Sequence, residues 1–360
     1  MATYADARLR IQALSNASAA AIVTSKRPRT AAAAPFPSSD STAAATAEQT
    51  SLDDIRNDAV VHAQGVSKEV TALTLALRPP VTELAVVGTL DKLGDILAKL
   101  AFIVDLLTRY DGALAKRVSW YILDVLETFQ HFLPYATAAL DKVPSDRQQK
   151  ARNELLRSAK TVWTTVDKAD QLPQTELAAE RQGWRDAITM LDDCLEEMKD
   201  LEESIEGGDD DKKEEEEEDT PAAEGRTEQD ASARPASRQR QRVNATRHLL
   251  RLGRLLVHRL VTKTATSSPA FADSAFLSQT RNLTSRMSAL GDDLALELEP
   301  PQEGLVEAVD DLCQVEDELA DLLEAAVTAR GSDELRASEG EWMATWRKQR
   351  TGVRSKLDAI

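Results

Sequence analysis

Cysteine, aromatic residues and long apolar runs are all scarce in this sequence. Its two cysteines, Cys194 and Cys313, are too few for a disulfide framework and favour a reducing compartment. Aromatic residues make up 4% of the chain, which disfavours a β-sandwich or barrel, whose strands are rich in them. The chain has no uninterrupted apolar run of about 18 residues, the length that a membrane-spanning helix requires. The sequence therefore predicts no membrane span.

Basic residues are also fewer than acidic ones. The 360 residues carry a formal net charge of −17, which argues against a protein that binds nucleic acid through bulk attraction to phosphate. The histidines show no pair at metal-ligand spacing, and no HExxH, CxxC, glycine-rich phosphate loop or GxSxG motif occurs. Adjacent acids such as Asp192 and Asp193 point in different directions on a helix, so they indicate a solvated face. We therefore expect no catalytic residue, no cofactor and no metal site.

Apolar residues at steps of three and four dominate what is present. Five such stripes occur in residues 51–205 and four in residues 242–360, and each predicts an amphipathic helix whose apolar face must be covered. One glutamate, Glu316, falls on an apolar stripe. The most regular stripe consists of Leu90, Leu93, Leu97, Leu100, Val104 and Leu107. Helices of about 25 residues with short connectors favour antiparallel neighbours. The sequence thus predicts an all-α protein of two up-and-down helical bundles, of about five and then about four helices.

Two segments outside these bundles have a different composition. Residues 206–241 are first acidic and then arginine-rich, and the acidic part from Glu206 to Asp219 has a net charge of −8. Such a segment buries too little apolar surface to offset its ordering entropy, so we expect a disordered linker. Residues 1–50 are rich in alanine, serine and proline. They are predicted to form a mostly disordered extension, with a short helix up to Val23.

Two basic clusters stand out against the acidic background. Lys26, Arg27 and Arg29 form a compact group in the predicted extension, as a nuclear import signal requires, although short basic groups also arise by chance. The second cluster is the arginine-rich segment 234–259, which has the composition of a DNA-contacting basic helix or of a helix neutralised by the acidic linker beside it. The second interpretation is favoured because the neighbouring acids would repel phosphate. Nucleic acid is therefore not an expected partner.

The stretch DDLALELEPP, residues 292–301, alternates apolar and acidic residues as a strand does. The residues before it, from Leu283 to Leu294, nevertheless step by three and four, which predicts the end of a helix that Pro300 and Pro301 terminate. A turn between two helices is the favoured interpretation.

Four segments together resemble the cyclin-D-binding protein family, also called GCIP or MAID-like: VSKEVTALTLAL (66–77), LAKRVSWYILDVLETFQHFL (114–133), AITMLDDCLEEMKDLEE (187–203) and DDLALELEPP. The order of a long helical half, an acidic loop and a shorter helical half is similar too, over about residues 51–330. The signature that carries most of this resemblance consists of Asp292, Asp293, Leu294, Leu296, Pro300 and Pro301.

The resemblance implies a non-enzymatic, helix-loop-helix-like adaptor. Members of the family bind D-type cyclins or other cell-cycle regulators, restrain cell-cycle progression and occur in the nucleus and the cytoplasm. We therefore expect protein partners, with a cyclin or another cell-cycle regulator among them. The alternative is a scaffold for cytoskeletal or membrane-proximal partners, since long up-and-down bundles are also similar to vinculin- and talin-like modules.

Overall fold

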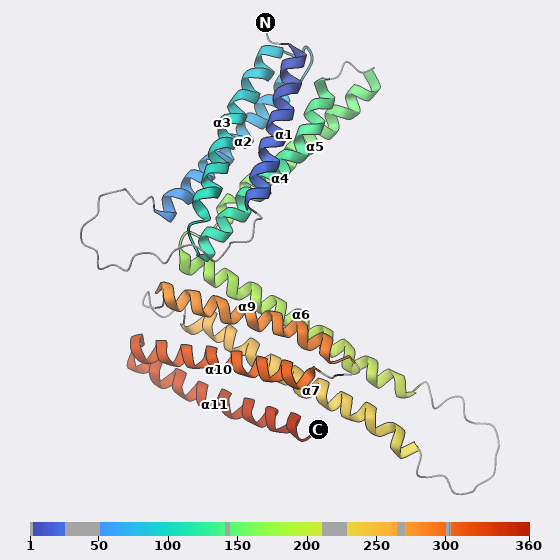
Figure 1. Ribbon diagram of the computed structural model, residues 1–360, viewed down its shortest axis with the longest axis vertical. Coiled ribbons are helices and arrows are strands. Elements are labelled where there is room, and N and C mark those ends of the chain that lie inside the picture. Colours follow the sequence, from blue (N-terminus) through green and yellow to red (C-terminus); the bar gives the residue numbers. More distant parts are fainter. Residues whose placement is uncertain are drawn as a thin grey trace, which may run out of the picture. The chain divides into compact units, whose positions relative to one another are not determined.

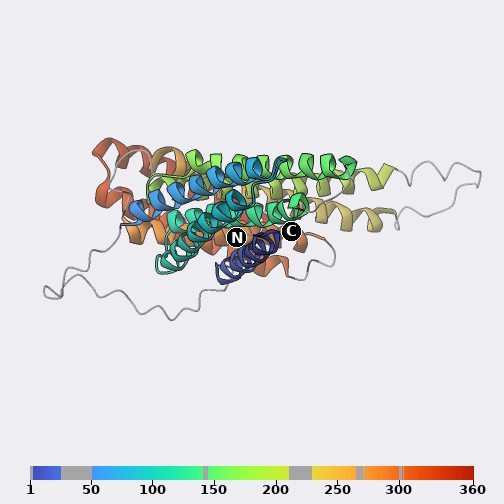
Figure 2. The same cartoon turned by 90° about the horizontal axis from the view of Figure 1, so that it is seen from above.

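The computed structural model describes residues 3–25, 51–140, 145–210, 229–264, 271, 273–299, 302 and 304–360. Within these ranges the chain forms helices and their connecting turns and no strand, which both views show (Figures 1 and 2). The prediction of an all-α protein built from two helical bundles is confirmed. The helices are α1 Tyr4–Ser25, α2 Leu52–Ala76, α3 Glu83–Leu107, α4 Ala113–Leu140, α5 Ser145–Asp167, α6 Glu176–Asp210, α7 Gln229–Arg259, α9 Ser274–Glu297, α10 Leu305–Arg330 and α11 Asp333–Asp358.

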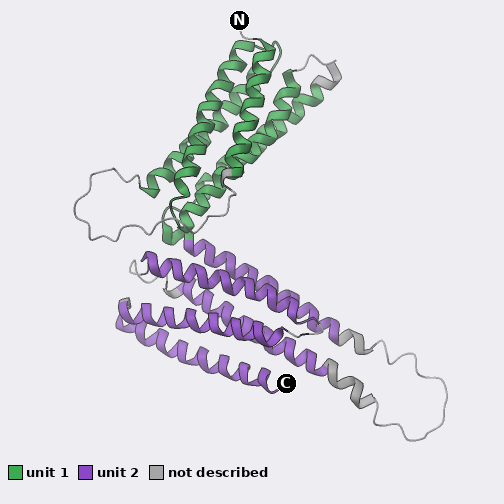
Figure 3. Cartoon of the chain, viewed as in Figure 1, with its two compact units in different colours: residues 1–179 green, residues 180–360 purple. Residues whose placement is uncertain are grey.

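The chain divides into two compact units, residues 1–179 and residues 180–360 (Figure 3). The boundary falls inside α6, so most of this helix belongs to the second unit. This division differs from the expected bundles 51–205 and 242–360, because an apolar stripe predicts that a helix face is buried but does not say which helix covers it. Residues 211–228 of the expected linker lie outside the described residues.

The first unit is built from helices α1 to α5. Helix α2 packs on α3 and α5, and α4 packs on α5. The leucine stripe of α3 points inward, with Leu93, Leu97 and Leu100 each 3% exposed or less. Ser51 caps α2, since its hydroxyl accepts a hydrogen bond from the backbone N–H of Asp54 at 3.1 Å. The stripes predicted in this half are therefore the core of the unit.

Helix α1 is an integral part of the first unit, not an extension outside the bundle. It packs on α3 and α4 and buries apolar residues at steps of three and four. Leu14 is 5% exposed and lies over Gly94 of α3. The sequence understated this helix because most of its apolar residues are alanines interspersed with serine and arginine, which gives a weak stripe. The buried residues of its apolar face are Ala7, Ile11, Leu14, Ala21 and Ile22.

The second unit is built from α6, α7, α9, α10 and α11. Helices α9 and α10 form a hairpin, α10 packs on the next helix α11, and α11 also packs on α7 (Figure 1). The buried aromatic residues among its described residues are Trp184, Phe271, Phe276 and Trp346, which are all 4% exposed or less. In the described part of the chain, no helix has both the length and the apolar character that crossing a membrane requires.

Candidate interaction surfaces

The two cysteine thiols are buried and unreactive at neutral pH. Burial raises the pKa of Cys194 to about 12, helped by the hydrogen bond to Asp292, and burial also raises the pKa of Cys313 to about 11. Both side chains are therefore thiols at neutral pH, whereas a reactive cysteine needs a thiolate. Among the described residues, histidine, cysteine and carboxylate side chains form no group of three or more that could hold a metal ion.

The predicted signature segment lies at the end of α9, which ends at Glu297 with Leu298 as its C-cap. Leu294 is fully buried, Leu296 is 71% exposed, and Asp293 is exposed to solvent. Asp292 accepts a hydrogen bond from the Cys194 thiol at 3.1 Å, which connects α9 to α6. The helical interpretation of this stretch is thus confirmed over Asp292 to Glu297. Pro300 and Pro301 lie outside the described residues.

Asp292 and Leu296 line a groove between α6 and α9 of about 430 Å³, which we call the acidic groove. Apolar residues of both helices line it, together with three acidic residues, Glu197, Asp292 and Glu299. None of these three forms an ion pair with a cation of the described residues. The lining residues are Glu197, Met198, Leu201, Asp292, Ala295, Leu296 and Glu299. The groove thus combines exposed apolar surface with uncompensated negative charge.

Gly291 is what allows α6 to approach α9 closely at this groove. It is buried, and a Cβ atom there would lie 3.3 Å from the Cys194 Sγ, 3.3 Å from the Leu191 Cδ2 and 3.5 Å from the Leu250 Cδ1. Three helices therefore converge on a residue without a side chain. This close packing explains why a glycine precedes the signature, which the sequence pattern alone did not reveal.

Several arginines of the arginine-rich segment pair with acids of other folded helices. Arg254 forms two hydrogen bonds to Asp192 of α6, at 2.7 and 2.9 Å. Arg247 pairs with Glu202 of α6 at 2.6 Å. Neutralisation by the acidic linker was the favoured interpretation, and it stays a prediction because residues 211–228 lie outside the described residues. The acidic partners among the described residues lie on α6 and α11. These pairs leave fewer arginines of α7 available for phosphate.

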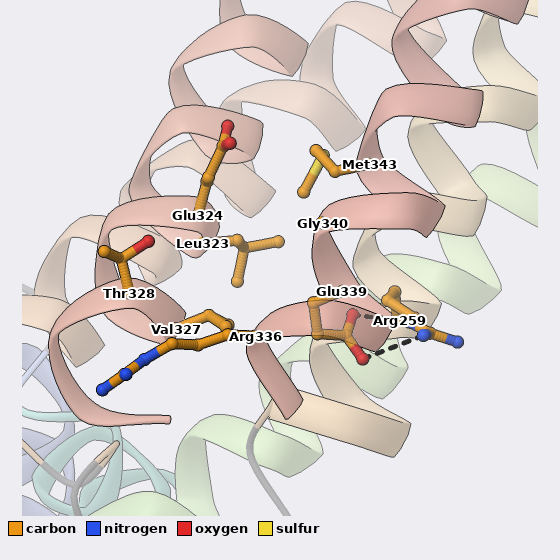
Figure 4. Close-up of a pocket in the computed structure, with 9 residues that line it drawn as sticks. All are labelled: Arg259, Leu323, Glu324, Val327, Thr328, Arg336, Glu339, Gly340 and Met343. Atoms are coloured by element: carbon orange, nitrogen blue, oxygen red, sulfur yellow. Dashed lines mark hydrogen bonds and ion pairs between the residues drawn. The ribbon is translucent and has the colours of Figure 1, made fainter. Parts of the chain in front are cut away.

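The third pair, between Arg259 and Glu339, borders a small pocket formed by α7, α10 and α11 (Figure 4). Arg259 forms two hydrogen bonds to Glu339, each 2.8 Å long, and its guanidinium lies 5.1 Å from the centre of the Trp342 ring. Leu323 and Met343 contribute apolar surface. The pocket measures about 90 Å³, well below the roughly 300 to 1,000 Å³ of typical ligand pockets. We therefore assign it a structural role.

The acidic groove was not predicted, because it exists only where α6 and α9 meet. One signal in the sequence pointed to it: Leu296 is apolar but lies off the buried stripe of its helix. The predicted import cluster Lys26, Arg27 and Arg29 lies outside the described residues, so that assignment stays a prediction.

These features define a helical protein whose candidate sites are surface grooves. Residues 60–204 match the family model described as Grap2 and cyclin-D-interacting, N-terminal. The match supports the resemblance to the cyclin-D-binding proteins over these residues, as the sequence predicted. The match covers about two fifths of the chain and runs from α2 into α6, so it includes the α6 side of the acidic groove. Among curated proteins, none matches the chain significantly.

Proposed function

We propose that this protein is a non-enzymatic adaptor that binds a D-type cyclin or a related cell-cycle regulator and restrains cell-cycle progression. The observation that carries the proposal is the match of residues 60–204 to a family described as cyclin-D-interacting. The all-helical fold supports it, because helical bundles present grooves and faces for partner helices.

The acidic groove is the surface to which we assign this binding. Protein interfaces combine apolar surface with polar groups, and both apolar and acidic residues line the groove. Leu296 is 71% exposed at this site, so a partner would remove its side chain from water. Burying a leucine side chain is worth about 1.5 to 3 kcal/mol, which makes Leu296 the expected hot spot.

Leu296→Ala is expected to weaken binding to a purified complex of a D-type cyclin and its kinase by about tenfold, the loss that corresponds to about 1.4 kcal/mol. Biolayer interferometry with the full-length chain measures it. The matched control is Val306→Ala on α10, since Val306 is 66% exposed and does not line the groove. The control should bind as the wild type does. Wild-type protein that binds no D-type cyclin would overturn the proposed function, and equal binding by both variants would overturn the assignment of the surface.

The scaffold alternative makes a different prediction for the same material. Sedimentation of the purified chain with filamentous actin, in the absence of cyclin binding, would favour a vinculin- or talin-like role. Binding to the cyclin complex without sedimentation favours the adaptor.

We further propose that the adaptor occurs in both nucleus and cytoplasm and that Lys26, Arg27 and Arg29 direct its import. Replacing all three with alanine should move a fluorescent full-length fusion towards the cytoplasm, because import receptors recognise compact exposed cationic clusters. Quantitative microscopy gives the ratio of nuclear to cytoplasmic fluorescence. The control is Arg8→Ala, since Arg8 lies on α1 outside the cluster. An unchanged ratio in the triple variant would exclude the cluster as the signal.

A further inference from the structure

Helices α7 and α11 pack antiparallel with a regular repeat. Near one end of the pair, Arg259 of α7 bonds Glu339 of α11 at 2.8 Å. The Trp346 indole N–H donates a hydrogen bond to the carbonyl of Leu252 at 2.9 Å. Trp346 lies seven residues after Glu339 on α11, and Leu252 lies seven residues before Arg259 on α7. Seven residues are about two helical turns, so the same face of each helix meets the other at every such step. The next step brings Val353 opposite Ala245.

The residues at this third step are small, and a cleft opens there. Trp346 is 2% exposed and fills the space between the helices at the second step. Ala245 and Val353 fill much less, and both line a cleft of about 630 Å³ between α7 and α11. That volume lies within the range of about 300 to 1,000 Å³ that is typical of ligand pockets. The cleft follows from the sizes of the side chains at one heptad position.

All titratable side chains that line this cleft are basic. They are Arg240 and His248 from α7 and Lys356 from α11. Lys356 is exposed, and it forms no ion pair with any described acid. Arg240 pairs with Glu202 of α6 at 3.8 Å. The pKa of His248 is lowered by burial first and then by Arg247, Arg251 and Lys356, as expected where cations gather.

We propose that this cleft, the cationic cleft, docks an acidic segment of a partner protein that carries an apolar side chain. The apolar side chain rests on Ala245 and Val353, while carboxylates of the segment face Arg240 and Lys356. Charge complementarity argues for this occupant, because the cleft is cationic on a chain whose net charge is −17. A nucleic acid fits less well, since the acidic remainder of the chain repels its phosphates at longer range.

The inference goes beyond the proposed function and does not depend on it. The acidic groove is lined by α6 and α9 and the cationic cleft by α7 and α11, and the two share no lining residue. A protein with two surfaces of opposite charge is suited to hold two different partners, which is what an adaptor requires.

The test uses the full-length chain and a fluorescein-labelled peptide of about twelve residues, made of glutamate with leucine at helical spacing. Fluorescence anisotropy is expected to show binding that Lys356→Glu weakens about tenfold, because the substitution puts a like charge against the peptide. The matched control is Lys348→Glu, on the same helix, exposed and outside the cleft, with the same change in net charge. It should change the affinity less than about twofold, since exposed charges beyond about one Debye length are screened.

A second variant tests the shape of the cleft. Val353→Trp should abolish binding by filling the space over Ala245, while circular dichroism verifies that both variants keep their helix content. Binding that is absent in the wild type, or that falls equally in the two lysine variants, would overturn the proposal. Binding of a single-stranded oligonucleotide with the same dependence on Lys356 would also overturn it. So would tighter peptide binding after Glu214 to Glu218 are replaced by serine, because the chain's own acidic segment would then be the occupant.

Discussion

Glu316→Gln is expected to make the protein more stable than the wild type by about 2 to 4 kcal/mol at pH 9 and to change little at pH 5. Glu316 is fully buried among α7, α10 and α11. Its Oε2 accepts a hydrogen bond from the Arg350 Nε at 3.1 Å, while its Oε1 has no partner among the described residues and lies against Gly253. Burial raises the pKa of Glu316 to about 8, and the nearby Arg350 opposes this only in part.

The direction of the pH dependence follows from this raised pKa. The folded protein retains the proton on Glu316 up to about pH 8, whereas the unfolded chain releases it near the ordinary value of 4.5. The stability that this group contributes is therefore complete below about pH 4.5 and is lost as the pH rises through about 8. Glutamine stays neutral and retains the bond to Arg350, so the difference between the variant and the wild type should grow with pH.

Urea unfolding at several pH values from 5 to 9, followed by circular dichroism, measures this difference. His62 and His248, whose pKa values are lowered mainly by burial, shift stability in the opposite direction near pH 6.5, and the comparison with the wild type cancels them. The control is Glu318→Gln on the same helix, since Glu318 is 40% exposed and pairs with Arg286 at 3.1 Å. A surface pair of this kind contributes about 0 to 1 kcal/mol. A difference that does not change with pH would show that Arg350 holds Glu316 ionised throughout.

The sequence revealed where Glu316 lies but not what it contacts. Its position on an apolar stripe of α10 predicted burial, because residues three and four apart share a helix face. Its partner Arg350 lies 34 residues further along the chain, and no local pattern connects them. The same limit explains α6: its stripe predicted that Trp184 and Leu191 are buried, while the covering helices α7 and α9 became clear only from the structure.

The candidate surfaces were less predictable than the core for the same reason. The acidic groove combines Glu197 with Asp292, and the cationic cleft combines Arg240 with Lys356. Each pair is more than 90 residues apart, so its charges appear in the sequence as separate solvated faces. The resemblance to the cyclin-D-binding proteins marked the α9 signature as important, and the structure shows which of its residues face solvent.

Gly291→Leu is expected to lower the stability of the second unit by about 1 to 3 kcal/mol or more, the typical cost of overpacking a core. The first atom of the new side chain already meets Cys194, Leu191 and Leu250 at 3.3 to 3.5 Å, and leucine adds three further heavy atoms. To make room, α6 has to move away from α9, which opens the acidic groove. The variant should therefore also lose affinity for the cyclin complex, beyond the effect of the fraction that is unfolded.

The control is Gly352→Leu on α11 of the same unit, where a Cβ atom would meet nothing within 4 Å. Leucine is the better helix former by roughly 0.8 kcal/mol, so this variant should be as stable as the wild type or slightly more so. Urea unfolding compares the two leucine variants, and biolayer interferometry at 10 °C, where the folded fraction is highest, compares their binding. Equal stability would mean that α6 does not approach α9 at Gly291, and reduced stability with unchanged binding would place the partner away from the acidic groove.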